Sequence, residues 1–141
     1  MMKNNGHITQ KEIFVPANMA IISHTNQKGL ITYVNDDFVK ISGFSREECI
    51  GKPHNMIRHP DMPAEAFRDL WATVKEGNPW QGIVKNRCKN GDHYWIKATV
   101  TPRGDGHYMS VRTHANTEEI NQAKKIGHPD FTVDPNSEIR F

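Results

Sequence analysis

Residues 80–113 have the sequence WQGIVKNRCKNGDHYWIKATVTPRGDGHYMSVRT, and this stretch decides the fold class. Its β-branched and aromatic residues fall into three runs, 80–88, 93–102 and 107–113. The first two runs are separated by Lys-Asn-Gly-Asp, whose Asn-Gly pair is a strong hairpin signal, and the last two by a Gly-Asp-Gly turn. The stretch therefore predicts three consecutive strands joined by short turns.

The first half of the chain adds two further strands. Residues 19–25 form a short apolar run, and residues 30–34 form a second run of strand length. The loop between them ends in Gly29, which suits a turn. Two such runs about a short loop predict a β-hairpin.

Short helical pieces follow this hairpin. Asn35 and Asp36 both suit a helix N-terminus, because their side-chain oxygens accept hydrogen bonds from unpaired backbone amides. Ser45 and Glu48 have the spacing of a capping box for a second short helix. Three prolines between 52 and 63 exclude a continuous helix there, so we expect turns and single helical turns.

A regular helix is predicted over 64–75, where apolar residues recur at the spacing of one buried stripe. A terminal helix is predicted over 117–126, with Thr117 as its cap. Runs of strands and helices segregated in this way indicate an α+β domain with an antiparallel sheet, whose helices can enclose a cavity. We expect an N-terminal arm over 1–18, a central domain over 19–116, and a helix with a tail over 117–141.

The composition excludes several classes of protein. Of the 141 residues, 36% are hydrophobic and 24% are charged, which suits one globular domain. The 18 basic and 16 acidic side chains are interspersed, so no basic stripe indicates binding to nucleic acid. Cys49 and Cys88 form no CxxC or CxxCH motif, which argues against a disulfide framework, a zinc knuckle and covalently attached haem.

The sequence also predicts a location. No apolar run approaches the roughly 18 residues that a membrane helix needs. The first residues lack the apolar region of a secretory signal, and two isolated cysteines suit a reducing compartment. We therefore expect a soluble, cytoplasmic protein without direct membrane insertion.

Alternation along the strands separates an inner face from an outer face. Gly82, Val84 and Asn86 share the inner face, where Gly82 leaves room for a group to lie against the sheet. A buried amide such as that of Asn86 needs partners, since leaving it unpaired costs about 1–3 kcal/mol. A ring with adjacent carbonyl and N–H groups, such as a flavin, supplies them. The alternative is that Asn86 is a turn-end residue bonded to backbone.

Trp95 falls on the outer face by the same alternation. A large aromatic side chain there favours a partner surface. The alternative is that a terminal arm of the chain covers Trp95.

The segment Arg58-His59-Pro60-Asp61 is a further candidate site, because proline stiffens the loop and fixes its side chains. Arg58 suits bidentate contact with a phosphate. His59 and Asp61 are able to bond each other or a ligand. The alternative is an ordinary loop in which Asp61 caps the following helix and Arg58 is solvated.

Other chemistries have weaker signals. The spacing of His54, His59 and Asp61 fits no common zinc pattern. Support for a haem site with His59 as its axial ligand is weak, because His59 is one histidine among eight. We find no GxSxG motif and no other setting for a nucleophile, so the chain is expected not to be an enzyme.

Residues 30–113 closely resemble the N-terminal PAS domain of bacterial aerotaxis receptors. The matching stretches are YVNDDFV at 33–39, ISGF at 41–44, WQGIVKNR at 80–87, KNGDHYW at 89–95 and YMSVRT at 108–113. The most specific stretch is GKPHNMIRHPDMP at 51–63, a run that PAS domains in general do not share.

The resemblance implies a PAS fold, with a five-stranded antiparallel sheet and helices over one face, that holds FAD without a covalent link. The cofactor-binding residues that it implies are Asn35, Arg58, His59, Asp61, Trp71 and Asn86. Within this set we expect Arg58 to meet the pyrophosphate and Asn86 the flavin ring, while His59 and Asp61 order the loop. The chain has no GxGxxG motif, so FAD is not expected to be held as in a Rossmann fold.

The function implied is that of a redox or oxygen sensor for energy taxis, which signals the flavin redox state through the sheet surface. The expected partners are downstream HAMP-like signalling segments of a chemoreceptor or a separate protein, with a homodimer as a further arrangement. No membrane, HAMP or signalling segment occurs in the sequence, so we expect an isolated sensor domain. The alternatives are a cofactor-free PAS interaction module and a PAS domain that binds haem.

Overall fold

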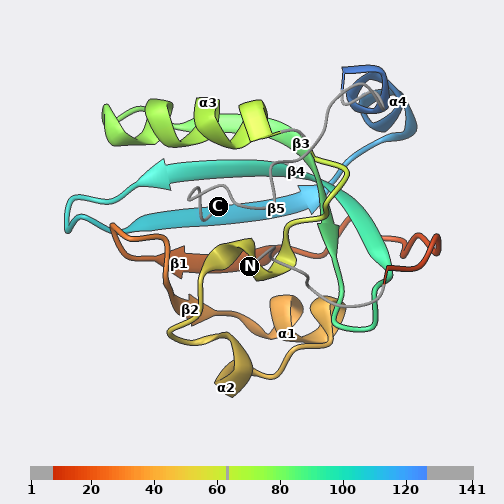
Figure 1. The fold of residues 1–141 in the computed structure, drawn as a ribbon, viewed down its shortest axis with the longest axis horizontal. Coiled ribbons are helices and arrows are strands. Elements are labelled where there is room, and N and C mark those ends of the chain that lie inside the picture. Colours follow the sequence, from red (N-terminus) through yellow and green to blue (C-terminus); the bar gives the residue numbers. More distant parts are fainter. Residues whose placement is uncertain (1–7, 63, 127–141) are drawn as a thin grey trace.

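One antiparallel sheet organises the chain (Figure 1). The computed structural model describes residues 8–62 and 64–126. Its strands are β1 (Ile21–Thr25), β2 (Ile31–Val34), β3 (Trp80–Arg87), β4 (His93–Pro102) and β5 (Tyr108–His114). Its helices are α1 (Asp36–Ser42), α2 (Arg46–Cys49), the 3-10 helix η1 (His54–Ile57), α3 (Ala64–Lys75) and α4 (Thr117–Ile126).

The strand order across the described sheet is β2-β1-β5-β4-β3, and every neighbouring pair is antiparallel. The predicted α+β fold with a five-stranded antiparallel sheet is therefore confirmed. Helices α3 and α4 and strand β4 have the predicted bounds, whereas β1 begins two residues later than predicted and β5 is shifted by one residue. The parts of the predicted arm and tail at 1–7 and 127–141 lie outside the described residues.

Local capping explains where the short helices begin and end. The Asn35 side chain accepts a hydrogen bond from the Phe38 amide at the start of α1, and Gly43 ends that helix with φ 78°, a left-handed conformation that favours glycine. Ser45 and Glu48 form the predicted capping box of α2. At α4 the cap is Asn116 rather than the predicted Thr117, because the Asn116 side chain accepts from the Glu119 amide.

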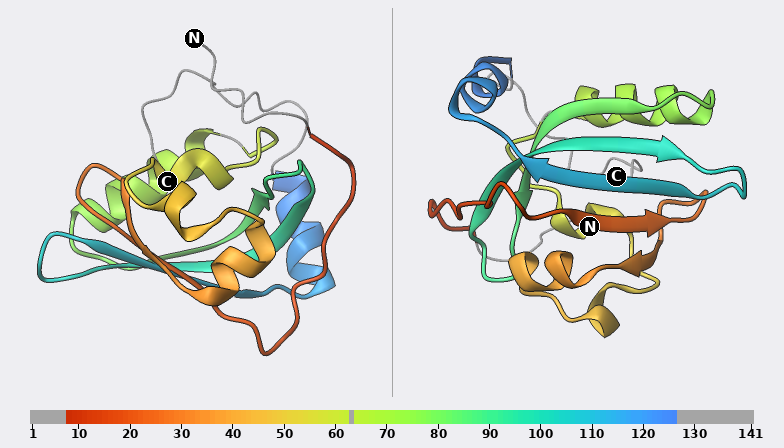
Figure 2. Two further views of the ribbon diagram at one scale, coloured as in Figure 1. Left: turned by 90° about the horizontal axis from the view of Figure 1, so that it is seen from below. Right: turned by 180° about the vertical axis from the view of Figure 1, so that it is seen from behind.

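Helices cover both faces of the sheet. Phe67 and Leu70 of α3 face the same side of the sheet as Val84 and Asn86, which is the predicted inner face. Helix α4 packs on the outer face, so the expected cover of one face alone is incomplete. Figure 2 shows α3 running along β3 and α4 beside one end of the sheet. Across the described residues, no helix has the length and apolar character needed to cross a bilayer.

The sequence predicted room for a ligand on the inner face at Gly82, and this prediction is wrong, because the Trp80 indole occupies that space. A Cβ atom added to Gly82 would lie 2.5 Å from Cη2 of Trp80, so the Trp80 indole covers the glycine. The Trp80 Nε1 donates to Asp69 on α3 at 2.8 Å, which holds the ring in this position. The glycine therefore admits a side chain of the protein itself rather than a ligand.

Candidate functional site

A small internal pocket lies between the inner face of the sheet, η1 and α3. It is lined by His54, Ile57, Arg58, Phe67, Leu70, Val84, Asn86, Ala98, Val100, Ser110 and Arg112. The four lining residues of β3 and β4 belong to the face predicted as inner, so that assignment is confirmed. The free volume is about 30 Å³, which suits a water molecule rather than a flavin ring.

Asn86 places an unsatisfied acceptor at this pocket. The residue is buried within β3, opposite Tyr94 of β4, and is not at a turn. Across residues 8–62 and 64–126, its Oδ1 has no hydrogen-bond partner. An orphaned buried acceptor costs about 1–3 kcal/mol. Asn86 Oδ1 therefore presents an acceptor that a ligand with an N–H group would satisfy.

Arg112 places a buried positive charge in the same pocket. Its guanidinium donates to Ser110 Oγ and, at 2.8 Å, to Ser23 Oγ, and it lies 5.4 Å from the centroid of the Phe38 ring. No carboxylate pairs with it among the described residues, and its Nε has no partner there. Burial lowers the pKa of Arg112 to about 10. An uncompensated buried cation of this kind favours an electron-rich or anionic ligand.

His54 completes the polar wall. Its Nε2 lies 2.8 Å from Ser23 Oγ and 3.4 Å from a guanidinium nitrogen of Arg112. Because Arg112 can only donate, its contact with His54 makes Nε2 an acceptor, and the Ser23 hydroxyl, which accepts from Arg112, then donates to His54. Burial, together with the charge of Arg112, holds the pKa of His54 well below its ordinary value. His54 is thus neutral and helps to orient the guanidinium.

Arg58 reaches the pocket from the segment after η1. It is buried rather than solvated, and its guanidinium lies 4.6 Å from the centroid of the Phe67 ring. Its backbone pairs with that of Asn86 at the edge of β3. The structure thus brings together Arg58 and Asn86, which lie far apart in the sequence.

His59 and Asp61 lie beside β3 but do not line the internal pocket. Asp61 Oδ2 accepts from Lys85 Nζ at 2.9 Å, and His59 Nδ1 accepts from the Asp61 amide at 3.1 Å. Burial and the charge of Lys85 lower the pKa of His59 to about 4. The buried His59 ring packs edge-on against His93, with 5.6 Å between the ring centroids. These contacts fasten residues 58–62 along the strand.

Asn35 and Trp71 lie away from the pocket-lining set. The Asn35 side chain accepts from the Ile22 and Phe38 amides and donates to the Ala20 carbonyl, so it joins β1 to α1. Trp71 packs on Tyr108 of β5, with 5.4 Å between ring centroids. Their contacts support the frame around the pocket.

The polar groups of the pocket match a flavin better than they match a metal or haem. Asn86 Oδ1 and the Arg112 guanidinium suit the N–H and carbonyl groups of a flavin ring. The described residues contain no group of three potential metal ligands, so His54, His59 and Asp61 do not converge as one. His59, the suggested axial ligand of haem, is outside the pocket. A flavin ring would need more space than the pocket has in this structure.

Sequence reasoning missed Ser23, His54 as a pocket residue, Ser110 and Arg112. The alternation of 107–113 places Ser110 and Arg112 on one face, and that signal was available. Ser23 contacts Arg112 across 89 residues of sequence, a pairing that no local pattern encodes.

The chain is similar in sequence to known sensory and regulatory proteins. The profile of the PAS fold family matches residues 31–114. The aerotaxis receptor of Escherichia coli is 48% identical over 123 residues, which are 84% of this chain and 24% of the receptor. A nitrogen fixation regulatory protein of Klebsiella pneumoniae is 27% identical over 64% of this chain and 19% of that protein. The chain thus spans a quarter or less of the length of these two relatives.

Solved structures agree on the fold. A light-oxygen-voltage domain studied with a flavin analogue superimposes with a TM-score of 0.65 at 16% identity, over 75% of this chain and 84% of that domain. A PAS domain from Colwellia psychrerythraea superimposes with a TM-score of 0.61 at 22% identity, over 68% of this chain and 86% of that one. Identities this low show a shared fold and do not identify a ligand.

Proposed function

Because the chain belongs to the PAS fold family, we propose that this sensory domain binds FAD non-covalently and signals the redox state of the flavin. The observation that carries the proposal is the pairing of an uncompensated buried cation, Arg112, with an orphaned buried acceptor, Asn86 Oδ1, in one pocket. A protein that bound nothing there would retain the cost of both groups. The likeness to an aerotaxis receptor supports the same assignment.

Each polar residue has a distinct task in this proposal. Asn86 accepts from and donates to the ring, and Arg112 supplies positive charge beside it. Arg58, which lines the same pocket, contacts the pyrophosphate of FAD. His59 and Asp61 do not touch the ring in this proposal, because they hold the segment that carries Arg58.

In this proposal, binding requires η1 and α3 to move away from the sheet, since the pocket has a free volume of only about 30 Å³. Several contacts resist this movement. At the edge of β3 they include the Arg58–Asn86 backbone pair, the Lys85 amide donating to Met62 Sδ at 3.4 Å, and the Asp61–Lys85 ion pair. The His54–Ser23 hydrogen bond and the burial of Phe67 and Leu70 also hold η1 and α3 in place. In this proposal these elements report whether the pocket is filled.

A flavin accepts and returns electrons, which changes its charge and hydrogen bonding. In this proposal Asn86 and Arg112 lie next to the flavin ring, so their interactions with it depend on its redox state. Lys85, next to Asn86 in β3, faces the outer side and lines the same groove as residues of α4. A different position of β3 in the two redox states would thus alter the outer face, provided the states differ in interaction free energy.

The wider setting belongs to the same proposal. The sensor spans 19–116, acts in the cytoplasm without catalytic turnover, and passes its signal to HAMP-like segments of a chemoreceptor, to a separate protein or to a second copy. In this proposal the surface that carries the signal is the outer face of the sheet, where α4 lines the groove together with β3 and β4.

One observation favours a second function, that of a cofactor-free interaction module. The internal pocket is almost filled by side chains of the protein, among them Phe67 and Leu70. In that case the signal would come from partner binding alone.

A visible spectrum of the purified full chain, before and after incubation with FAD, separates these functions. FAD binding gives a yellow protein whose flavin absorbance bleaches on reduction. A colourless protein that cannot be reconstituted supports the interaction module and overturns the redox proposal. A sharp Soret band would instead identify haem.

A further inference from the structure

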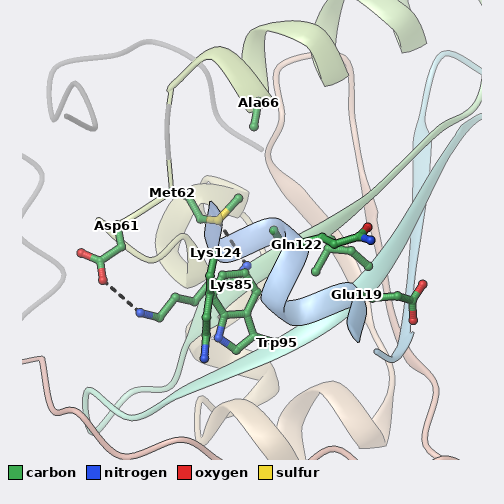
Figure 3. Close-up of a pocket in the computed structure, with 10 residues that line it drawn as sticks. Asp61, Met62, Ala66, Lys85, Trp95, Glu119, Gln122 and Lys124 are labelled. Carbon is green, nitrogen blue, oxygen red and sulfur yellow. Dashed lines mark hydrogen bonds and ion pairs between the residues drawn. The ribbon is translucent and has the colours of Figure 1, made fainter. Parts of the chain in front are cut away.

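A groove of about 470 Å³ lies on the outer side of the sheet, separate from the internal pocket (Figure 3). Its walls are α4, the outer faces of β3 and β4, and the residues Asp61, Met62 and Ala66. The volume lies within the range of about 300–1,000 Å³ that is usual for small-molecule sites. Apolar lining comes from Met62, Ala66, Ile83 and Ala123, and Trp95 forms the floor.

Trp95 carries an unused donor at this groove. The indole is covered by α4, as the alternative for the terminal arm predicted, and only 8% of its surface is exposed. Across the described residues its Nε1 has no hydrogen-bond partner. Buried tryptophan N–H groups normally find an acceptor. This donor therefore requires an acceptor that the described protein does not supply.

The charges of the groove leave one ammonium uncompensated. Asp61 pairs with Lys85 at 2.9 Å, and Glu119 pairs with Lys97 at 2.6 Å. Lys124 forms no ion pair within residues 8–62 and 64–126, although its Nζ lies 5.9 Å from the centroid of the Trp95 ring. Figure 3 shows the Lys124 side chain extending beside this ring. A lysine without an ion pair and a tryptophan with an unpartnered N–H thus line the same apolar groove.

We propose that this groove is a second ligand site, which takes a small apolar carboxylate. The carboxylate accepts from Trp95 Nε1 and pairs with Lys124, and the apolar body packs on Met62, Ile83 and Ala123. The site does not depend on a flavin in the internal pocket. It shares the 58–62 segment with that pocket, since Asp61 and Met62 line the groove while Arg58 lines the pocket.

The test uses the full chain and naphthalene-2-carboxylate as the probe. The indole N–H resonance of Trp95, identified by its loss in Trp95→Phe, is followed by two-dimensional NMR during titration. We expect a saturable shift of this resonance, and a weaker response to the neutral analogue naphthalene-2-methanol. Absence of a saturable shift would overturn the proposal.

Two variants locate the carboxylate. Lys124→Gln is expected to weaken binding of the probe about fivefold, the effect of one partly exposed ion pair. Lys125→Gln, on the next and exposed position of α4, is expected to leave affinity unchanged. Equal affinities in the two variants, or equal losses, would contradict the assigned carboxylate position.

A third variant tests whether the probe binds in the internal pocket instead of the groove. Asn86→Leu alters that pocket and leaves the groove intact, so the probe is expected to bind it with unchanged affinity. Loss of binding in Asn86→Leu, or displacement of FAD by the probe, would place the ligand inside and overturn the outer site.

Discussion

The backbone of Arg58 pairs with the backbone of Asn86 across the free edge of β3. β3 is the last strand in the sheet order, so this contact and the Lys85–Met62 bond cover an edge that would otherwise expose unpaired amides. The pairing also sets the candidate phosphate contact beside the candidate ring contact. Arg58 and Asn86 are therefore joined directly through their backbones.

Replacing Arg58 tests the proposed phosphate contact. Arg58→Ala should lower FAD affinity about tenfold or more, because a charge-assisted hydrogen bond contributes about 1.5–3 kcal/mol. The fold should survive, as judged by circular dichroism. Arg68→Ala, an exposed arginine on α3, is the matched control and should bind FAD normally. Full retention of FAD by Arg58→Ala would refute the phosphate role.

Replacing Asn86 should affect stability and binding in opposite directions. Asn86→Leu removes an orphaned acceptor, so the free energy of unfolding of the FAD-free protein should rise by about 1 kcal/mol. FAD affinity should fall about tenfold for loss of the ring contacts. Gln81→Leu, on the exposed face of the same strand, should change neither quantity by more than about 0.5 kcal/mol. If Asn86→Leu binds FAD as tightly as the parent, the ring contact is wrong.

Arg112 should set the redox potential as well as the affinity. Arg112→Met keeps the length of the side chain and removes its charge, so a flavin in the pocket should show a more negative midpoint potential in spectroelectrochemical titration. The reason is that a buried cation stabilises added electrons in a medium of low dielectric constant. Arg103→Met, on the exposed turn after β4, is the control. An unchanged potential in a folded Arg112→Met protein would remove Arg112 from the site.

The Asp61–Lys85 ion pair should act on the flavin only through the loop. Asp61→Asn and Lys85→Met should each weaken FAD binding modestly, with a coupling energy of about 0.5–1 kcal/mol in a double-mutant cycle. The measurement is FAD affinity by fluorescence quenching for the parent, both single variants and the double variant. Strict additivity would show that the pair does not position the loop.

Stability should decrease as the pH falls from about 6.5 toward 4. Burial and Lys85 lower the pKa of His59 from 6.5 to about 4, and burial lowers that of His54 as well. Between pH 6.5 and about 4 these histidines bind protons in the unfolded chain but stay neutral in the folded chain. Their contribution to the free energy of unfolding is therefore fully present above the unfolded pKa and is lost as the pH falls through the folded pKa. Each pKa unit of such a shift corresponds to about 1.4 kcal/mol.

Urea unfolding across this pH range measures the effect. His59→Asn, whose Oδ1 can replace Nδ1 as acceptor for the Asp61 amide, should reduce the slope without abolishing it, because His54 remains. His107→Gln, on the half-exposed β4–β5 turn, should keep the parental slope. A parental slope in His59→Asn would show that His59 is not the group responsible.

Local chemistry determined most of the fold. The caps at Asn35 and Ser45, the Asn-Gly turn and the alternation along 80–88 act over a few residues, so they can be identified in the sequence and are present in the structure. The same alternation placed Asn86 on the inner face and Trp95 on the outer face. These predictions depended on geometry that each element carries within itself.

Only the tertiary structure decided how distant segments meet. It brought Ser23 to Arg112, fastened Arg58 to the edge of β3, laid Trp80 over Gly82 and set α4 against Trp95. It also decided that the internal pocket has a free volume of about 30 Å³ while the outer groove has about 470 Å³. The physical reason is that such contacts depend on the joint packing of the sheet and its helices, and no local pattern specifies which side chain fills a shared space.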